Sequence, residues 1–343
     1  MKYLDEEEFF HSREHRKSRK RSKTREEPKK TGILGRVLSV TGEGVVVEVE
    51  GIELLCNLKG LMKKEKKESS IVTVGDLVQV ERETKRILHV EERHSFLGRE
   101  DPFGREQQLI AANIDQVLIV TAIPSLKPTL IDRTLIAAEL GNIHPIIVIN
   151  KIDLLNEVSE KECDLYHQMI EAYEPLGIPL LSVSTRTGIG LENLRSLMNQ
   201  KISAFAGQSG VGKSSLLNTT FGLRLQTGDL AQKTGKGSHT TTRARLLPLP
   251  HGGFCIDTPG IRSFGIWKIR KSDVMNHFRE FVPYASECRY PDCTHLKEPL
   301  CAVQKALQEK RLSQLRFSSY QALMEELLEG VEQRQRKRRA RDE

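Results

Sequence analysis

A glycine-rich octapeptide near the middle of this 343-residue chain constrains its fold more than any other feature. It reads Gly-Gln-Ser-Gly-Val-Gly-Lys-Ser and fits the pattern G-x-x-x-x-G-K-[ST] in full. An apolar, strand-like run precedes it, and residues 213–221 favour a helix. A strand, loop and helix in this order turn backbone N–H groups toward phosphate oxygens. We expect phosphate or nucleotide contacts from Gly207, Gln208, Ser209, Gly210, Val211, Gly212, Lys213, Ser214 and Ser215.

Four residues are suited to the phosphates and to a metal ion between them. Lys213 supplies positive charge to the β- and γ-phosphates, and the Ser214 hydroxyl is a Mg²⁺ ligand in such loops. Asp257 ends an apolar run and begins the tetrapeptide Asp-Thr-Pro-Gly, which suits an indirect partner of the same ion. Gly260 closes the tetrapeptide and offers its N–H to the γ-phosphate. The sequence therefore predicts a Mg²⁺ site at Ser214 and Asp257.

A second motif, Asn-Lys-Ile-Asp, follows the apolar run at 144–149 and indicates a guanine site. Asp153 can accept hydrogen bonds from N1–H and the 2-amino group of guanine, and adenine offers neither donor. Asn150 is placed to bond the purine edge, and Lys151 to pack over the ring. We expect the segment Ser184-Thr185-Arg186 to support the base through backbone N–H groups. Asp153 argues against the rival interpretation, an ATPase.

The segment around these motifs alternates strand-like and helix-like patterns. Residues 116–122 and 144–150 are continuous apolar runs, as expected of parallel strands buried on both faces. Helical patterns cover 128–142 and 157–175. This alternation predicts a doubly wound α/β domain.

The order of the motifs along the chain is unusual. In ordinary GTPases the phosphate loop comes first and the guanine motif last, whereas here Asn150 precedes Gly207. The order is guanine motif, base support, phosphate loop, switch and Asp-Thr-Pro-Gly. It predicts a circularly permuted GTPase domain, in which the usual ends are joined and the new end falls after the second switch, the segment that contains Asp-Thr-Pro-Gly.

Residues 33–95 have the pattern of a small β-barrel. About five short apolar runs are separated by glycine turns and by the charged segment Lys-Lys-Glu-Lys-Lys-Glu-Ser-Ser. This size and strand count favour an oligonucleotide-binding (OB) fold, and any other small barrel is the alternative. Few aromatic residues occur here, so base stacking is not evident from the segment.

Three cysteines and a histidine lie within 14 residues near the C-terminus. Three thiolates and an imidazole satisfy a tetrahedral Zn²⁺ site, so we expect one structural zinc ion bound by Cys288, Cys293, His295 and Cys301. Metal binding is favoured over disulfides in a reduced cytosol. The other cysteines, Cys56, Cys163 and Cys255, lie in apolar segments and are expected to be core residues.

The net charge of +7 is concentrated at the two ends of the chain. Residues 1–30 carry a net +4 and residues 331–343 a net +3. Neither end has the apolar content to fold alone, so each is either a solubilising tail or an attraction for a polyanion such as RNA. No apolar run approaches the roughly 18 residues of a membrane span, and no secretory signal is evident. We expect a soluble, cytoplasmic protein that contacts no membrane.

The combination resembles the ribosome small subunit-dependent GTPase A family (RsgA, also called YjeQ), which consists of circularly permuted GTPases. The resemblance covers about residues 32–330 and rests on an OB-like domain, the permuted GTPase and the Cys/His cluster. The family's loop appears at 207–216 and its His-Thr-Thr-Thr switch at 239–242. The chain departs from the family at Ser238, where arginine is expected, and at the segment Ser-Thr-Arg, where Ser-Ala-Lys is expected.

The resemblance implies a factor that acts late in assembly of the small ribosomal subunit. Its GTP hydrolysis would be stimulated by the subunit, and its partners would be the subunit and its rRNA. The implied cofactors are GTP or GDP, Mg²⁺ and one structural Zn²⁺, and we expect a monomer. The alternative is a passive RNA-binding protein whose nucleotide site only stabilises the fold.

The residue that positions the attacking water is not the usual glutamine. Ile261 stands after the switch glycine, so another side chain is required. His239 is the best candidate because a neutral imidazole accepts a hydrogen bond from water, although spacing alone equally allows a surface histidine. One of Thr240–Thr242 is expected to ligate Mg²⁺, and spacing does not choose among them. We group Thr242 with His239 and Lys213 as the catalytic residues.

These interpretations give an α/β GTPase domain between an N-terminal OB-type barrel and a C-terminal, zinc-binding and partly helical domain. A single charged helix is expected over 302–330. The predicted boundaries are a charged tail at 1–31, the OB domain at 32–96, the permuted GTPase domain at 97–275, the zinc-binding and helical domain at 276–330, and a basic tail at 331–343.

Overall fold

Four parallel strands form the centre of the fold. They are β8 (Gln116–Ala122), β9 (His144–Asn150), β10 (Leu180–Ser182) and β11 (Ile202–Ala206), and they pair in the order β10-β9-β8-β11. Every residue of β8 and β11 is buried, as the continuous apolar runs predict. On β8, Val117 and Ile119 pack toward one layer of helices, while Leu118 and Val120 pack toward the other.

The structure is a computed structural model that describes residues 32–58, 72–100, 107–225, 244–257 and 271–327. Gly32–Glu343 form one compact unit. Within the described ranges no helix is both long and apolar enough to cross a membrane. Five residues named in the predicted switches lie outside these ranges: His239, Thr240, Thr241, Thr242 and Gly260.

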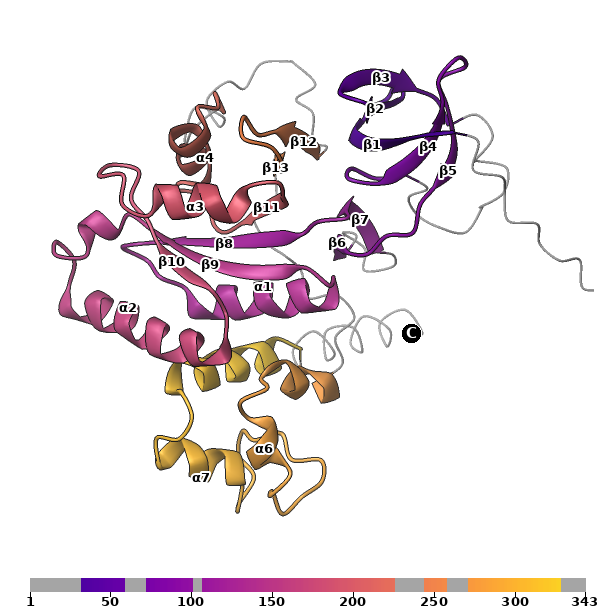
Figure 1. Ribbon diagram of the computed structural model, residues 1–343. Helices are drawn as coiled ribbons and strands as arrows, with labels where there is room; N and C mark the ends of the chain where they lie inside the picture. The colour runs from indigo at the N-terminus through magenta and orange to yellow at the C-terminus, as the bar shows by residue number, and fades with distance from the viewer. Residues whose placement is uncertain (1–31, 59–71, 101–106, 226–243, 258–270, 328–343) are drawn as a thin grey trace, which may run out of the picture. The chain divides into compact units, whose positions relative to one another are not determined.

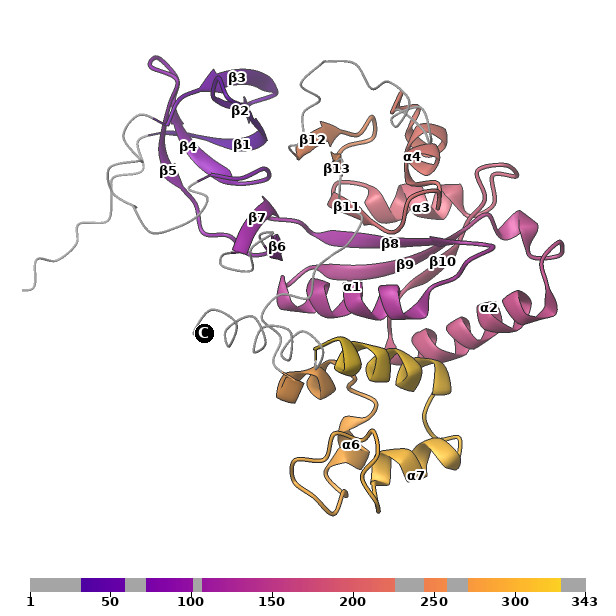
Figure 2. The same ribbon diagram turned by 180° about the vertical axis from the view of Figure 1, so that it is seen from behind.

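Helices cover both faces of the central sheet, as expected for a doubly wound α/β domain (Figures 1 and 2). One layer holds α1 (Pro128–Leu140) and α2 (Glu160–Tyr173), and the other holds α3 (Leu191–Met198) and α4 (Lys213–Phe221). The helices expected at 128–142 and 157–175 are therefore present, slightly shortened. The first ends before Gly141, and the second passes into the short 3-10 turn η3 (Glu174–Leu176).

The central sheet extends beyond β11 through two further strands. β13 (Phe254–Asp257) runs parallel to β11, and β12 (Arg245–Pro248) pairs antiparallel with β13. The strand before the phosphate loop, β11, therefore lies between β8 and β13. The strand that precedes Asp-Thr-Pro-Gly thus ends beside the phosphate loop, although these segments are far apart in the sequence.

The N-terminal strands close into a small ring. They are β1 (Ile33–Val40), β2 (Val45–Val49), β3 (Ile52–Cys56), β4 (Leu77–Glu81) and β5 (Arg86–Val90). β1 pairs with β2 and β4, β2 with β3, and β4 with β5, while a bridge between Asn57 and Arg86 joins the two free edges. Inward-facing valines such as Val37, Val47 and Val78 fill the interior. Five strands are present as expected; assignment of the ring to the OB class stays a prediction.

A hairpin not expected from the sequence follows this ring. β6 (Phe96–Glu100) and β7 (Gln107–Ala112) form a separate two-stranded sheet. The charged segment between them interrupts the apolar pattern by which strands are predicted. The ring is also hydrogen-bonded to the central sheet, because Ser39 of β1 pairs with Arg245 of β12. The ring and the central sheet are thereby joined into one 11-stranded sheet.

The C-terminal residues form a small helical module with an aromatic core. Its elements are the 3-10 helix η4 (Lys271–His277), α6 (Val282–Ala285), α7 (Ala302–Gln308) and a helix at 314–327. The single helix expected over 302–330 is therefore wrong. The chain turns at 309–313, where Lys310 has a φ of 56°. The break allows Phe317 and Tyr320 to pack against Phe278 and Phe281.

A buried ion pair fastens this module to α1. The Arg316 guanidinium donates to Asp132 of α1 and to Glu280, the latter at 2.7 Å, while the Tyr173 hydroxyl donates to Asp132 at 2.8 Å. The side chains of Arg316 and Asp132 are 4% and 0% exposed. Burial raises the pKa of Asp132, and Arg316 opposes that rise. Each charge of the pair therefore offsets the desolvation cost of burying the other.

Replacing Arg316 should destabilise the protein because Asp132 would be left without its cation. We expect Arg316→Ala to lower the free energy of unfolding by about 3 kcal/mol at neutral pH. The deficit should shrink as pH falls, since a buried carboxyl with a raised pKa is stabilised by protonation. Urea denaturation measures both effects. Arg82→Ala, which removes an exposed pair with Glu50, is the control and should cost less than about 1 kcal/mol. Equal stability of the two variants would contradict the expectation.

Candidate functional site

The glycine-rich loop lies between β11 and α4, in the context that the sequence predicts. Gly207 has a φ of 134° and Gly212 a φ of 92°, conformations that favour glycine. A Cβ atom at Gly207 would lie 2.1 Å from the carbonyl oxygen of Val120, and one at Gly212 would lie 2.4 Å from Asn150 Nδ2. The glycines are therefore required by close packing against β8 and β9. A side chain at Gly207 would push the loop away from the backbone of β8, and one at Gly212 would collide with the Asn150 amide group.

The lysine and serines of the motif occupy the first turn of α4. The Lys213 ammonium group lies across the loop and donates to the carbonyl oxygens of Gly207 at 2.7 Å and Gln208 at 2.6 Å. Ser214 and Ser215 follow it and are half-buried. The N-terminus of a nine-residue helix thus meets a cation at the point where phosphates are expected. The arrangement suits a polyphosphate.

The Asn-Lys pair at the end of β9 is bonded directly to the phosphate loop. Asn150 Nδ2 donates to the carbonyl oxygen of Val211 at 2.8 Å, and Lys151 Nζ donates to that of Gly210 at 3.1 Å. Asn150 is 1% exposed, and its Oδ1 has no hydrogen-bond partner among the described atoms. A buried acceptor without a partner is typical of a polar site that a ligand completes. The two predicted motifs therefore form one site.

The aspartate of the guanine motif is held by the segment after β10. The Ser184 hydroxyl donates to Asp153 Oδ1 at 2.6 Å and accepts the N–H groups of Arg186 and Thr187. The backbone N–H of Ser184 donates to the carbonyl oxygen of Ile189. The expected support of a base by the Ser184 N–H is therefore wrong, because the tight turn uses that donor. The Arg186 N–H likewise donates within the turn, to the Ser184 hydroxyl, so the same expectation is wrong for Arg186. Ser184 contributes its hydroxyl, and the role of the Thr185 N–H stays a prediction.

Other predicted residues are placed only in part. Asp257 ends β13, which runs beside β11, so its backbone lies at the same sheet edge as the phosphate loop. His239, Thr242 and Gly260 lie outside the described residues, so their roles stay predictions. The placed residues nevertheless gather at the carboxyl ends of parallel strands, the edge at which open α/β sheets bind ligands.

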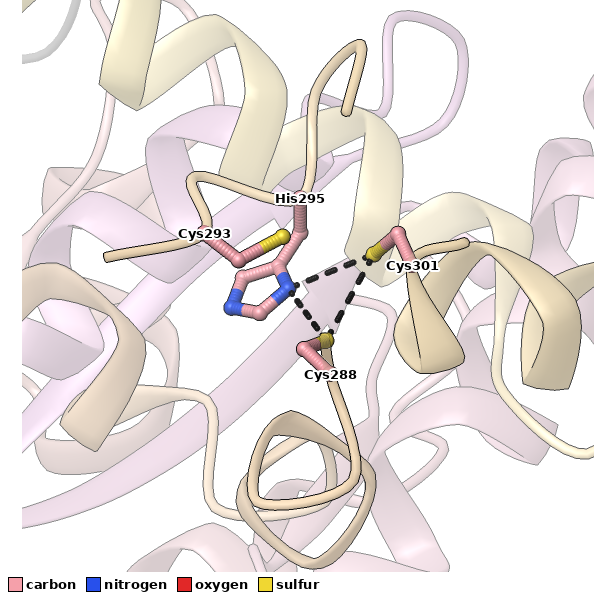
Figure 3. A group of neighbouring side chains, drawn as sticks. All are labelled: Cys288, Cys293, His295 and Cys301. Carbon is pink, nitrogen blue, oxygen red and sulfur yellow. Dashed lines mark hydrogen bonds between the residues drawn. The ribbon is translucent and has the colours of Figure 1, made fainter. Parts of the chain in front are cut away.

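The Cys/His cluster forms a compact group of potential metal ligands in the C-terminal module (Figure 3). His295 Nδ1 lies 3.5 Å from Cys288 Sγ and 3.4 Å from Cys301 Sγ, and the two sulfurs are 3.8 Å apart. Zn–S bonds of about 2.3 Å and Zn–N bonds of about 2.0 Å place tetrahedral ligands about 3.5–3.8 Å apart. The ligand atoms of all four residues lie within 4.8 Å of one another. The cluster is consistent with zinc in donor type and in spacing.

Burial changes the protonation of the cluster in two ways. It lowers the pKa of His295, which keeps the imidazole neutral, as ligation requires. Burial and the neighbouring thiols of Cys301 and Cys288 raise the pKa of Cys293 to about 12, so this thiol is protonated at neutral pH when no metal ion is bound. Metal binding would release that proton, because the thiolate is the form that ligates a metal.

Three residues that the sequence does not single out support the cluster. Glu298 accepts hydrogen bonds from Thr294 and from the N–H groups of residues 296 and 297. Burial alone would raise the pKa of Glu298, but these bonds lower it to about 2, so the carboxylate stays ionised. Gln304 donates to the carbonyl oxygen of His295, and the Tyr320 hydroxyl donates to that of Thr294. Of the three, only Glu298 could have been found from the sequence, because it lies between the predicted ligands His295 and Cys301.

Comparison with known proteins decides which GTPase family this site belongs to. The family model described as RsgA GTPase matches residues 90–267. The chain belongs to the RsgA GTPase family. It is therefore a GTP-hydrolysing enzyme, and the family implies GTP, GDP and Mg²⁺ as ligands of the site described above.

Curated relatives and solved structures agree with this assignment. A relative from Klebsiella pneumoniae (strain 342), named "Small ribosomal subunit biogenesis GTPase RsgA", is 43% identical over 252 residues, covering 72% of this chain and 70% of the relative. The crystal structure of YjeQ from Thermotoga maritima is similar with a TM-score of 0.69 and 32% identity, covering 86% of this chain and 98% of that one. YloQ, described as a circularly permuted GTPase, has a TM-score of 0.64 and 26% identity, with coverages of 87% and 96%. The predicted circular permutation is thereby confirmed.

Base selection by the RsgA-type site can be tested at Asp153. Asp153→Asn should weaken GTP binding on the order of a hundredfold, because two hydrogen bonds to a charged acceptor are lost or impaired. It should also favour xanthosine triphosphate, whose edge carries a carbonyl in place of the amino group. Fluorescent nucleotide titration measures both, with the exposed Asp164→Asn as control. Equal affinity of the wild type for ATP and GTP would refute the role of Asp153.

Metal binding can be tested at Cys293. Cys293→Ser should reduce zinc from about one ion per chain to well below half, and should increase hydrogen exchange over residues 288–301, because a structural metal supplies folding free energy. Elemental analysis and exchange measurements provide the readouts. Cys163→Ser lies outside the cluster and should change neither. Cleanly purified wild type without metal would remove the basis of this expectation.

Proposed function

We propose that this GTPase binds the small ribosomal subunit and acts in its late maturation, hydrolysing GTP with stimulation by the subunit. The relatives named as small ribosomal subunit biogenesis GTPases support this function. The chain aligns with about 70% of such a relative and with 98% of the YjeQ structure. The cytoplasm is the corresponding place of action, and we propose that the chain acts as a monomer.

The contact between Asn150 and the carbonyl oxygen of Val211 is the observation that carries the nucleotide part of the proposal. It joins the segment proposed to read the base to the segment proposed to hold the phosphates. A nucleoside triphosphate would then bind with its base at Asp153 and its phosphates at Lys213. A site that held only a phosphate ion would have no use for the ordered carboxylate of Asp153.

The roles of the individual residues follow from this placement. Lys213 and the loop N–H groups bind the phosphates, Ser214 and Asp257 serve the Mg²⁺ ion, and Ser215 supports the first turn of α4. Asp153 and Thr185 bind the base. When bound, Mg²⁺ neutralises phosphate charge that develops during hydrolysis. His239 positions the attacking water and Thr242 belongs to the same switch, as the sequence predicts.

The C-terminal cluster is proposed to hold one structural zinc ion. Cys288, Cys293, His295 and Cys301 fill all four tetrahedral positions, which leaves none for substrate. The ion would stabilise a module that otherwise depends on a small aromatic core. This module is fastened to α1 through Arg316, so its folding affects the GTPase domain.

Ribosomal RNA is the proposed partner of the flanking regions. The ring of strands β1 to β5 has the strand count and pairing of an OB barrel, a class that binds oligonucleotides. The basic ends of the chain, with net charges of +4 and +3, suit a polyanion. Both features support contact with rRNA.

Hydrolysis with and without purified small subunits tests the function. We expect slow turnover alone and stimulation of at least about tenfold by small subunits, because an external partner must complete a site in which Ile261 replaces glutamine. Large subunits serve as the control. His239→Ala should retain GTP binding and lose the stimulation. Binding to subunits without any stimulation would favour the alternative, a passive RNA-binding protein.

A further inference from the structure

The carboxylate of Asp153 is enclosed by one short turn. Ser184, which is fully buried, covers Oδ1 with a hydrogen bond of 2.6 Å. The same hydroxyl accepts the N–H of Arg186 at 3.2 Å and that of Thr187 at 3.1 Å. One oxygen atom therefore positions both the carboxylate and the backbone that carries Arg186.

Arg186 lies against the other oxygen of the carboxylate. Its Nη1 is 3.7 Å from Asp153 Oδ2, and no other ion pair of Asp153 occurs within the described part of the chain. The Arg186 side chain is 71% exposed and that of Asp153 is 11% exposed. Ser184 therefore faces the protein interior, and Arg186 covers the side of the carboxylate that is turned toward solvent.

A guanine base must approach Asp153 from that solvent side. Its N1–H and 2-amino groups together require both carboxylate oxygens, and Ser184 is too deeply buried to leave an inner path. We propose that Arg186 competes with guanine for Asp153, and so lowers the affinity of the site for GTP and GDP alike. The proposal rests on the proposed role of Asp153 as the guanine-reading residue.

The exposure of the pair determines the size of the effect. Exposed ion pairs contribute at most about 1 kcal/mol, so displacement of Arg186 weakens nucleotide binding by about two- to fivefold. Salt screens such a pair, and the effect therefore fades as ionic strength rises. GTP and GDP carry the same base, so their affinities change by the same factor. The consequence would be faster release of either nucleotide, GDP included.

Removing the guanidinium tests the competition directly. Full-length protein freed of nucleotide is titrated with fluorescent GDP and a fluorescent GTP analogue. Arg186→Ala should bind both about two- to fivefold more tightly than wild type at low salt, and equally at about 1 M salt. Arg186→Lys keeps the charge and should stay near wild type. Lys201→Ala removes one exposed cation at the opposite edge of the sheet, before β11, and should have no effect.

A second comparison separates competition from direct contact with the base. In an Asp153→Asn background the carboxylate charge is absent, so Arg186→Ala should no longer change GDP affinity. Weaker GDP binding by Arg186→Ala would show that the guanidinium stabilises the bound base and would overturn the proposal, as would unchanged affinity at low salt. A wild type that does not prefer GDP to ADP would instead refute the guanine site itself.

Discussion

The hydrogen bond from Asn150 to the carbonyl oxygen of Val211 is the contact on which the site depends. It links the end of β9 to the phosphate loop after β11, and β8 lies between these strands. The bond holds together the segment proposed to read the base and the segment proposed to bind the phosphates. It also explains why residue 212 is glycine, since a Cβ there would collide with the same amide group. The order of the strands in the sheet therefore brings the proposed base site and the proposed phosphate site together.

Circular permutation changes where the chain enters this arrangement and leaves the arrangement itself intact. The phosphate-loop strand remains central, with β8 on one side and β13 on the other. What the permutation alters is the neighbourhood of the switches. The segment of the first switch leads into β12, which pairs with β1 of the N-terminal ring, and the segment after β13 leads into the C-terminal module. Each flanking domain is therefore adjacent, in sequence or by strand pairing, to a segment predicted to be a switch.

The buried ion pair between Arg316 and Asp132 links the C-terminal module to the GTPase domain. Arg316 reaches from the last described helix to Asp132 on α1, and Ile136 of α1 belongs to the aromatic core of the module. The α1 helix starts next to the phosphate loop, since Lys127 and Leu130 line the same small cavity as Gly207 and Gln208. One helix thus lies beside the phosphate loop at its beginning and contacts the C-terminal module further along its length.

The sequence alone determined the chemistry of the protein. The phosphate loop, the Asn-Lys-x-Asp motif and the Cys/His cluster are local patterns from which phosphate, guanine and metal binding are predicted, and the inverted order of the first two is read directly along the chain. The sequence also predicted the buried parallel strands, because apolar runs are a local signal. The β6–β7 hairpin, the break at 309–313 and the use of the Ser184 hydroxyl were decided by tertiary structure. The break and the Ser184 contact depend on residues distant in the chain, and the hairpin, although local, is held by backbone hydrogen bonds to Val74 and Gly141. No local pattern specifies which donor, turn or strand edge remains available after packing.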